Sequence, residues 1–171
     1  MNSSLVFLLA FGIGLVTGLR SMTGPAVVCW AAHLGWLNLE GSRLAFMEST
    51  AATYGFSVLA LGELVADKLP FVPNRTSPGP LFGRIVLGSL SGAAISVAGG
   101  QSAVVGAILG GAGGVIGAFA GYRARADLVG KSRLPDWAIA LLEDIVAVGP
   151  FSGLAILIQR SSDSCGKMNS V

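Results

Sequence analysis

Charged residues inside apolar stretches are the part of this sequence best able to do chemistry. Five of them interrupt or directly follow such stretches: Arg20, Glu63, Asp67, Glu143 and Asp144. A charge at the centre of a lipid bilayer costs about 2.5–3.5 kcal/mol, so these side chains should face a protein interior or water. Because buried acids that lie close together favour proton uptake, the five residues predict a proton or substrate site. The alternatives are a structural ion-pair network with Arg20 or Arg84, or Lys68 extending its amine to the membrane interface.

A second, overlapping group of polar residues suits an anion. Its members are Arg20, Ser21, Thr23, Arg75, Thr76 and Arg84. A guanidinium beside a helix N-terminus is a favourable place for a phosphate or carboxylate. The group therefore supports a second hypothesis, the binding of an anionic lipid or a lipid-linked phosphate.

Signatures of other chemistries are missing from the sequence. There is no HExxH, GxSxG, Walker loop or paired-aspartate motif of phosphoalcohol transferases, so we expect neither an enzyme nor a cofactor. Cys29 and Cys165 form no CxxC and have no histidine at metal-binding spacing, so we expect no metal. The net charge is only +2 and no basic tract is dense, which argues against nucleic acid as a partner.

The composition predicts that these residues sit in a membrane. Of the 171 residues, 53% are hydrophobic and 12% are charged, and the mean hydropathy is +0.73. Soluble domains are about 25% charged, so this chain has too little polar surface to cover a globule in water. We expect an all-α integral membrane protein with one domain, residues 1–160, and a polar tail, residues 161–171.

Apolar stretches give the expected helices, which are Ser4–Leu19, Leu44–Leu69, Leu81–Ala98, Ala103–Tyr122 and Trp137–Ile158. A shorter piece, Ala26–Leu37, follows the first stretch, with Ser21 or Thr23 as its N-cap and Pro25 in its first turn. The fold is thus about five transmembrane helices plus a broken or re-entrant segment, or six helices if that piece crosses. No Lys or Arg precedes the first stretch, so we expect a retained helix and not a signal peptide.

Glycines at every fourth position predict close helix packing. Gly106, Gly110 and Gly114 form one such run and Gly113, Gly117 and Gly121 form a second, and shorter pairs occur at Gly14 and Gly18 and at Gly88 and Gly92. Small residues let helices approach closely, which matters in lipid because there the hydrophobic effect does not drive helices together. A glycine-lined pore is the alternative interpretation.

The distribution of Lys and Arg predicts an orientation. One side would hold Lys68, Arg75, Arg84, Arg123, Arg125, Lys131 and Arg133, and the other would hold Arg43, Arg160 and Lys167. Cytoplasmic loops carry the excess of basic residues. We therefore expect loops 70–80 and 123–135 in the cytoplasm and the C-terminus in the periplasm.

Two parts of the chain resemble each other. The pattern GxxxGxR ends at Arg20 and again at Arg123, and the pattern ALxE ends at Glu63 and again at Glu143. Three stretches separate the copies, so they would be oppositely oriented, as in the inverted repeats of transporters. Chance similarity among apolar helices is the alternative. The repeats would be residues 4–71 and 103–158, joined by a linker helix at 81–98.

Several motifs resemble those of a known family. They are Gly18-Leu19-Arg20-Ser21, Gly62-Glu63, Asp67-Lys68-Leu69-Pro70, Pro73-Asn74-Arg75-Thr76 with Pro78, and Gly83-Arg84. From about Leu5 to Ile158 the chain resembles an uncharacterised bacterial membrane family, the domain of unknown function 4126 group. The resemblance implies a multi-pass protein of the bacterial inner membrane and carries no activity with it.

These features together favour a small membrane transporter or channel, with proton coupling as one form of it. The partners would be the lipid bilayer and a small solute, a proton or an anionic lipid, and a homo-oligomer is one option. The alternatives are a protein that binds an anionic lipid or lipid-linked phosphate, and a structural or assembly partner without transport activity.

Overall fold

The computed structural model describes residues 2–66 and 78–131, and all regular structure within these ranges is helical. In chain order the elements are α1 (Ser3–Leu19), α2 (Thr23–His33), the 3-10 helix η1 (Ala45–Glu48), α3 (Thr50–Ala66), α4 (Pro78–Ala98) and α5 (Ala103–Lys131). The expected all-α class is confirmed for these residues. The expected helix at 137–158 and the tail at 161–171 lie outside the described residues.

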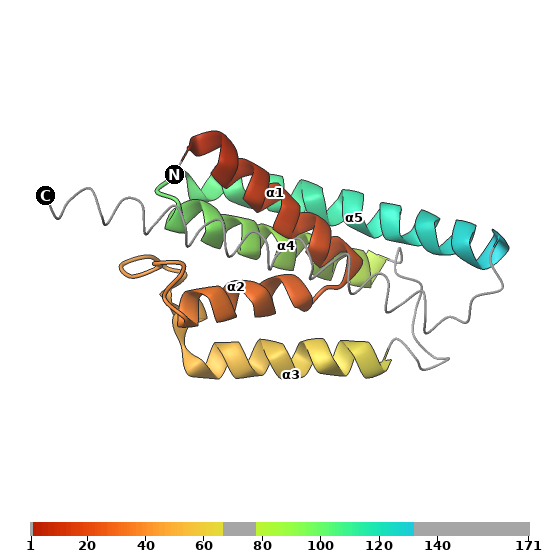
Figure 1. Cartoon of the computed structure of the whole chain (residues 1–171), viewed down its shortest axis with the longest axis horizontal. Helices are drawn as coiled ribbons and strands as arrows, with labels where there is room; N and C mark the ends of the chain where they lie inside the picture. Colours follow the sequence, from red (N-terminus) through yellow and green to blue (C-terminus); the bar gives the residue numbers. More distant parts are fainter. Residues whose placement is uncertain (1, 67–77, 132–171) are drawn as a thin grey trace, which may run out of the picture.

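The first apolar region forms two helices that reverse direction. α1 ends at Leu19, Arg20 is extended, and α2 begins at Thr23 and runs back along α1 (Figure 1). Gly24 lies against Thr17 and Ile13 of α1, and a Cβ at Gly24 would be 3.1 Å from the Cβ of Thr17. The shorter piece is therefore a complete helix of its own, earlier and shorter than expected, and not the second half of one broken helix.

α1, α4 and α5 form a three-helix core held by glycines. Gly110 of α5 lies between Gly14 of α1 and the glycines Gly88 and Gly92 of α4, and a Cβ at Gly110 would be 3.0 Å from the Cα of Gly92. Such contacts join backbone to backbone, because no side chain stands between the helices. α4 and α5 are connected by the turn at residues 99–102, where Gly100 has a positive φ of 69°.

α2 lies between this core and α3 (Figure 1). A buried apolar cluster joins α1, α2 and α4 to the connection that follows α2, and its members are Val6, Leu9, Ala10, Ile13, Val28, Cys29, Ala32, Leu37, Leu39, Met47, Ala94 and Ile95. α3 packs on α2 and η1 at the edge of the bundle. The cluster fills the end of the bundle that holds the connection between α2 and α3.

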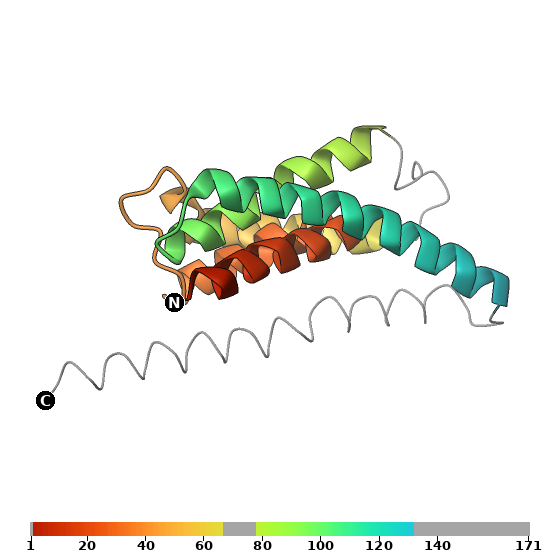
Figure 2. The same ribbon diagram turned by 90° about the horizontal axis from the view of Figure 1, so that it is seen from above.

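Several helix boundaries differ from those expected. α3 begins at Thr50 because Ser49 ends η1 and accepts a hydrogen bond from the N–H of Ala52 (3.2 Å), as an N-cap does. α4 begins at Pro78, since proline is tolerated in the first turn of a helix. α5 runs to Lys131 through residues expected as a basic loop, because no proline or glycine pair stops it there; Figure 2 shows it extending past the other helices.

The expected inverted repeat is wrong for the described pair of helices. Gly14 faces Gly110, and Gly18 faces Gly114 and Gly117, so residue numbers rise together and α1 and α5 run in the same direction. The reason is the reversal after α1, which makes α2 a separate helix. The chain then changes direction four times between α1 and α5, and an even number of reversals leaves the two helices parallel. The remainder of the second copy, at 132–158, lies outside the described residues.

Two described helices are long and apolar enough to cross a membrane, Gly79–Ala98 and Ala103–Arg123, and Ser3–Leu19 is a shorter apolar helix. This is weak support for a membrane association. The C-terminal ends of α1, α3 and α5 lie at one end of the bundle, and the connection that contains Arg43 lies at the other (Figure 1). The arrangement is compatible with the expected grouping of basic residues, while the side that faces the cytoplasm stays a prediction.

Candidate functional site

Glu63 joins α3 to the reversal between α1 and α2. Its Oε1 accepts a hydrogen bond from the backbone N–H of Ser21 (2.8 Å), and its Oε2 accepts one from the backbone N–H of Met22 (2.9 Å). Both oxygens of one carboxylate are therefore engaged by consecutive amides some 41 to 42 residues earlier in the chain. The site is partly buried and lies where three helices meet.

The start of α2 explains why a carboxylate sits there. The first amides of a helix have no intrahelical partner, and the helix dipole favours negative charge at that end. Neither Ser21 nor Thr23 supplies the expected N-cap: Met22 is the N-cap residue, and no side-chain cap bond is made there. Pro25 lies in the first turn as expected. The carboxylate of Glu63, which lies in α3, accepts hydrogen bonds from the amides of Ser21 and Met22 in place of a local N-cap side chain.

Two arginines are buried beside this reversal. Arg20 and Arg84 are 5% and 4% exposed, which makes them the most buried charged residues of the described part of the chain. Gly114 of α5 lies against Gly18 and also against the backbone of Arg84, where a Cβ on Gly114 would be 2.9 Å from the Arg84 oxygen. The segment leading to Arg20 and the start of α4 therefore converge on one place in α5.

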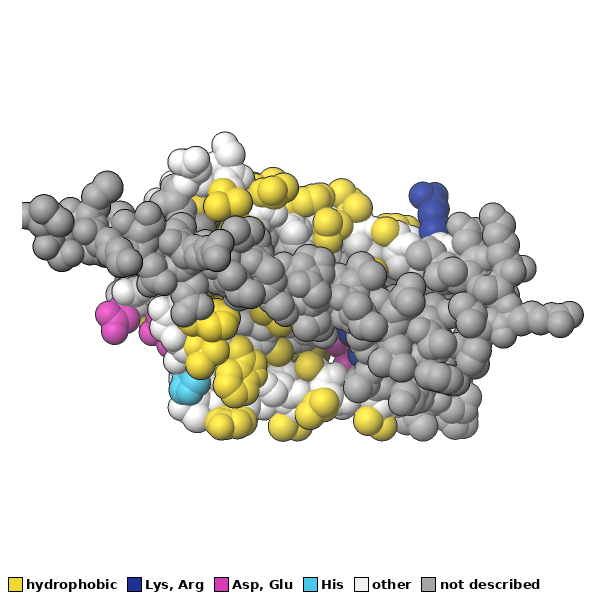
Figure 3. Space-filling view, in the orientation of Figure 1, with side chains coloured by type: hydrophobic (Ala, Val, Ile, Leu, Met, Phe, Trp, Pro, Cys, Tyr) yellow, Lys and Arg dark blue, Asp and Glu magenta, His cyan; other side chains and the backbone are white. Residues whose placement is uncertain are grey.

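The structure brings together some of the expected site residues. Ser21 and Glu63 are joined by the hydrogen bond described above, Arg20 directly precedes Ser21 in the chain, and Thr23 opens α2. Figure 3 shows basic and acidic side-chain atoms next to each other in the right half of the face it presents. The remaining candidates lie outside the described residues, namely Asp67, Arg75, Thr76, Glu143 and Asp144.

The candidate packing glycines all lie at helix contacts. Gly106 faces α4, Gly110 and Gly114 face both α1 and α4, and Gly117 and Gly121 face α1. For example, a Cβ at Gly117 would be 3.0 Å from the Cα of Gly18. Because neighbouring helices fill the space over these glycines, they do not line a pore in this arrangement.

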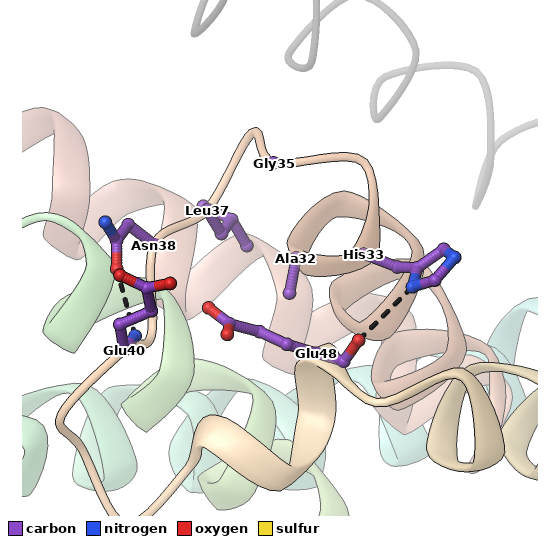
Figure 4. A pocket seen from close by; sticks show the side chains of 7 residues that line it. All are labelled: Ala32, His33, Gly35, Leu37, Asn38, Glu40 and Glu48. Carbon is purple, nitrogen blue, oxygen red and sulfur yellow. Dashed lines mark hydrogen bonds between the residues drawn. The ribbon is translucent and has the colours of Figure 1, made fainter.

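A pocket at the opposite end of the bundle was missed by the sequence analysis. It has a volume of about 290 Å³ and is lined by Ala32, His33, Gly35, Leu37, Asn38, Glu40 and Glu48 (Figure 4). Its residues come from the end of α2, the following connection and η1. That connection has no helical periodicity, so only its unusual density of polar residues in an apolar chain could have indicated it.

Hydrogen bonds fix the shape of this pocket. Glu48 Oε1 accepts the backbone N–H of Leu39 (2.5 Å), and Asn38 Oδ1 accepts the backbone N–H of Glu40 (2.9 Å). Nδ1 of His33 lies 3.2 Å from the backbone oxygen of Glu48, and in this hydrogen bond the ring nitrogen donates because a carbonyl oxygen only accepts. Within residues 2–66 and 78–131, no group of three or more His, Cys, Asp or Glu side chains is placed to hold a metal ion.

Comparisons with known proteins identify a family. No curated protein and no solved structure matches the chain. One family model matches residues 7–158, which is most of the chain, and its description is a domain of unknown function. The chain therefore belongs to the DUF4126 family.

Proposed function

We propose that the protein is a small membrane transporter or channel whose activity depends on proton binding at Glu63. The observation that carries this proposal is the pair of hydrogen bonds from the amides of Ser21 and Met22 to one carboxylate. This carboxylate is a titratable group that holds the start of one helix to the side of another.

Apolar side chains on the outside of the bundle support a membrane location. On α3, Val58, Leu61 and Val65 are 66%, 62% and 64% exposed, and they recur at helical spacing on one face. Figure 3 shows hydrophobic side chains along the edges of the molecule. Exposed apolar patches of this kind are typical of surfaces that meet lipid or another protein.

Proton binding at Glu63 would weaken the tie between α3 and α2. The charged carboxylate accepts at both oxygens, whereas the protonated group turns one oxygen into an O–H donor and loses the charge that the helix terminus favours. The amide that faces the O–H oxygen, Ser21 or Met22, then has a weaker, uncharged acceptor. The start of α2 is held less tightly, which favours movement of α2 relative to the glycine-packed core. Proton uptake is thereby linked to the position of a helix.

A flux assay tests this proposal. The protein would be reconstituted into liposomes that contain a pH-sensitive dye, and proton entry would be followed under an imposed membrane potential. Glu63→Gln keeps the shape of the side chain but cannot titrate, and we expect it to lower the proton flux at least tenfold. Asp163→Asn, the same chemical change in the expected polar tail, should stay within twofold of the unmodified protein. Full flux in Glu63→Gln would contradict the proposal.

The binding of an anionic lipid or lipid-linked phosphate is the second candidate. The amides at the start of α2 and the buried Arg20 beside them suit phosphate oxygens as well as a carboxylate. A phosphate would take the place that Glu63 occupies. Native mass spectrometry would then detect a co-purified anionic phospholipid that is lost in Arg20→Met, while liposomes would show no proton flux.

A further inference from the structure

We propose that the pocket at the end of α2 binds a small organic ammonium ion. The site lies at the opposite end of the bundle from Glu63, so the inference goes beyond the proposed function and does not depend on it. It rests on the volume of the pocket, the charge of its lining and the arrangement of its carboxylates.

The pocket carries negative charge and no fixed positive charge. Glu40 and Glu48 both line it, and neither lysine nor arginine is among its described lining residues. A cation in this cavity interacts favourably with both carboxylates. The ligand class is therefore cationic.

The arrangement of the lining favours an ammonium group over a metal ion. Glu48 Oε1 already accepts the amide of Leu39, which leaves Oε2 as its second acceptor. In Figure 4 the carboxylates of Glu40 and Glu48 point to the Asn38 side of the pocket, while the His33 ring lies on the other side. Calcium prefers about six to eight oxygen ligands. The side chains of Glu40, Glu48 and His33 do not form a group that could hold a metal ion. An ammonium group needs only two or three acceptors.

The remaining wall of the pocket sets the size and character of the ligand. Ala32 and Leu37 are buried residues whose side chains contribute an apolar surface beside the carboxylates. A volume of about 290 Å³ is at the lower end of the range for ligand pockets. A short alkyl chain with one ammonium head combines the charge, the apolar body and the size that this lining requires.

Calorimetric titration of the full-length protein in detergent tests the inference, with n-butylammonium as the probe. Its neutral counterpart, 1-butanol, and calcium ions serve as comparison ligands. We expect n-butylammonium to bind at least tenfold more tightly than 1-butanol, and calcium not to compete with it. Equal binding of 1-butanol, displacement by calcium, or no binding of n-butylammonium would each overturn the inference.

Three substitutions locate the binding in this pocket. Glu40→Gln changes an exposed side chain, and Glu48→Gln keeps an acceptor for the Leu39 amide, so both proteins should fold. Each should weaken n-butylammonium binding at least fivefold. Asp163→Asn is the matched control, because it makes the same chemical change at a residue that is not among the described lining residues, and it should change binding less than twofold. Unchanged binding in both glutamate variants, at unchanged melting temperature, would overturn the inference.

Discussion

The three-helix core of α1, α4 and α5 and the pair formed by α2 and α3 are held by different kinds of contact. In the core, Gly110 brings three backbones together at a contact made by glycines. Between α2 and α3 the ties are polar side chains, chiefly Glu63 to the amides of Ser21 and Met22. The difference is the basis of the proposal that the core is rigid and that the position of α2 depends on the state of one carboxylate.

The largest expected effect comes from filling the glycine contact. In Gly110→Ala the new Cβ would clash with the backbone oxygen of Gly88 and lie 3.0 Å from the Cα of Gly92, and backbone atoms cannot move aside as a flexible side chain can. Overpacking of this kind costs about 1–3 kcal/mol or more. We expect a marked fall in melting temperature in detergent.

Glycines of α3 provide the control for this prediction. Gly55→Ala and Gly62→Ala make the same change where no atom lies within 4 Å of the new Cβ. Alanine is a better helix former than glycine by about 1 kcal/mol, so these proteins should be unchanged or slightly more stable. A Gly110→Ala protein as stable as these two would mean that the core is not held by glycine contacts.

An intermediate effect is expected from removing the tie at Glu63. Glu63→Ala leaves the partly buried amides of Ser21 and Met22 without their acceptor, which costs about 1–3 kcal/mol. Hydrogen exchange followed by mass spectrometry should show faster exchange at the start of α2, with little change in α4 and α5. Faster exchange spread evenly over all helices would contradict the division into two parts.

The sequence predicted local features of this fold better than distant ones. The spacing of Gly106, Gly110 and Gly114 is a property of one helix, so their common face followed from the helical repeat. The cap of α2 comes from Glu63, about 41 residues further along. No local rule indicates such a partner, and the local rule that favoured Ser21 or Thr23 was therefore wrong.

The direction of α2 was also beyond local reasoning. Hydropathy showed a polar break around Arg20, but the same break fits a kink, a re-entrant segment or a reversal. The choice between them depends on contacts such as Gly24 against Thr17, which form only in the folded chain. Whether the chain reverses after α1 decides whether α5 runs parallel or antiparallel to α1. It therefore also decides whether the two similar helices can belong to an inverted repeat.

The smallest expected effect concerns another hydrogen bond between α2 and α3. Trp30 Nε1 donates a hydrogen bond to Ser57 Oγ (2.9 Å), and the Trp30 ring meets Tyr54 edge to face with centroids 6.1 Å apart. Trp30→Phe keeps an aromatic ring but removes the donor. Ser57 Oγ also donates to the backbone oxygen of Thr53 (2.7 Å) and keeps that partner, so the loss should cost about 0.5 kcal/mol or less, below the usual net value of a hydrogen bond.

The comparison with Glu63 makes this last prediction informative. Ser57→Ala removes the acceptor of the same bond, and the double variant Trp30→Phe/Ser57→Ala measures the coupling between the two side chains. We expect a small coupling energy and an unchanged proton flux, because neither residue titrates or touches the start of α2. If instead Trp30→Phe lowered the flux as much as Glu63→Gln, the position of α2 would be controlled by its whole contact with α3. The carboxylate would then be one tie among several, without a special role as the proton-dependent link.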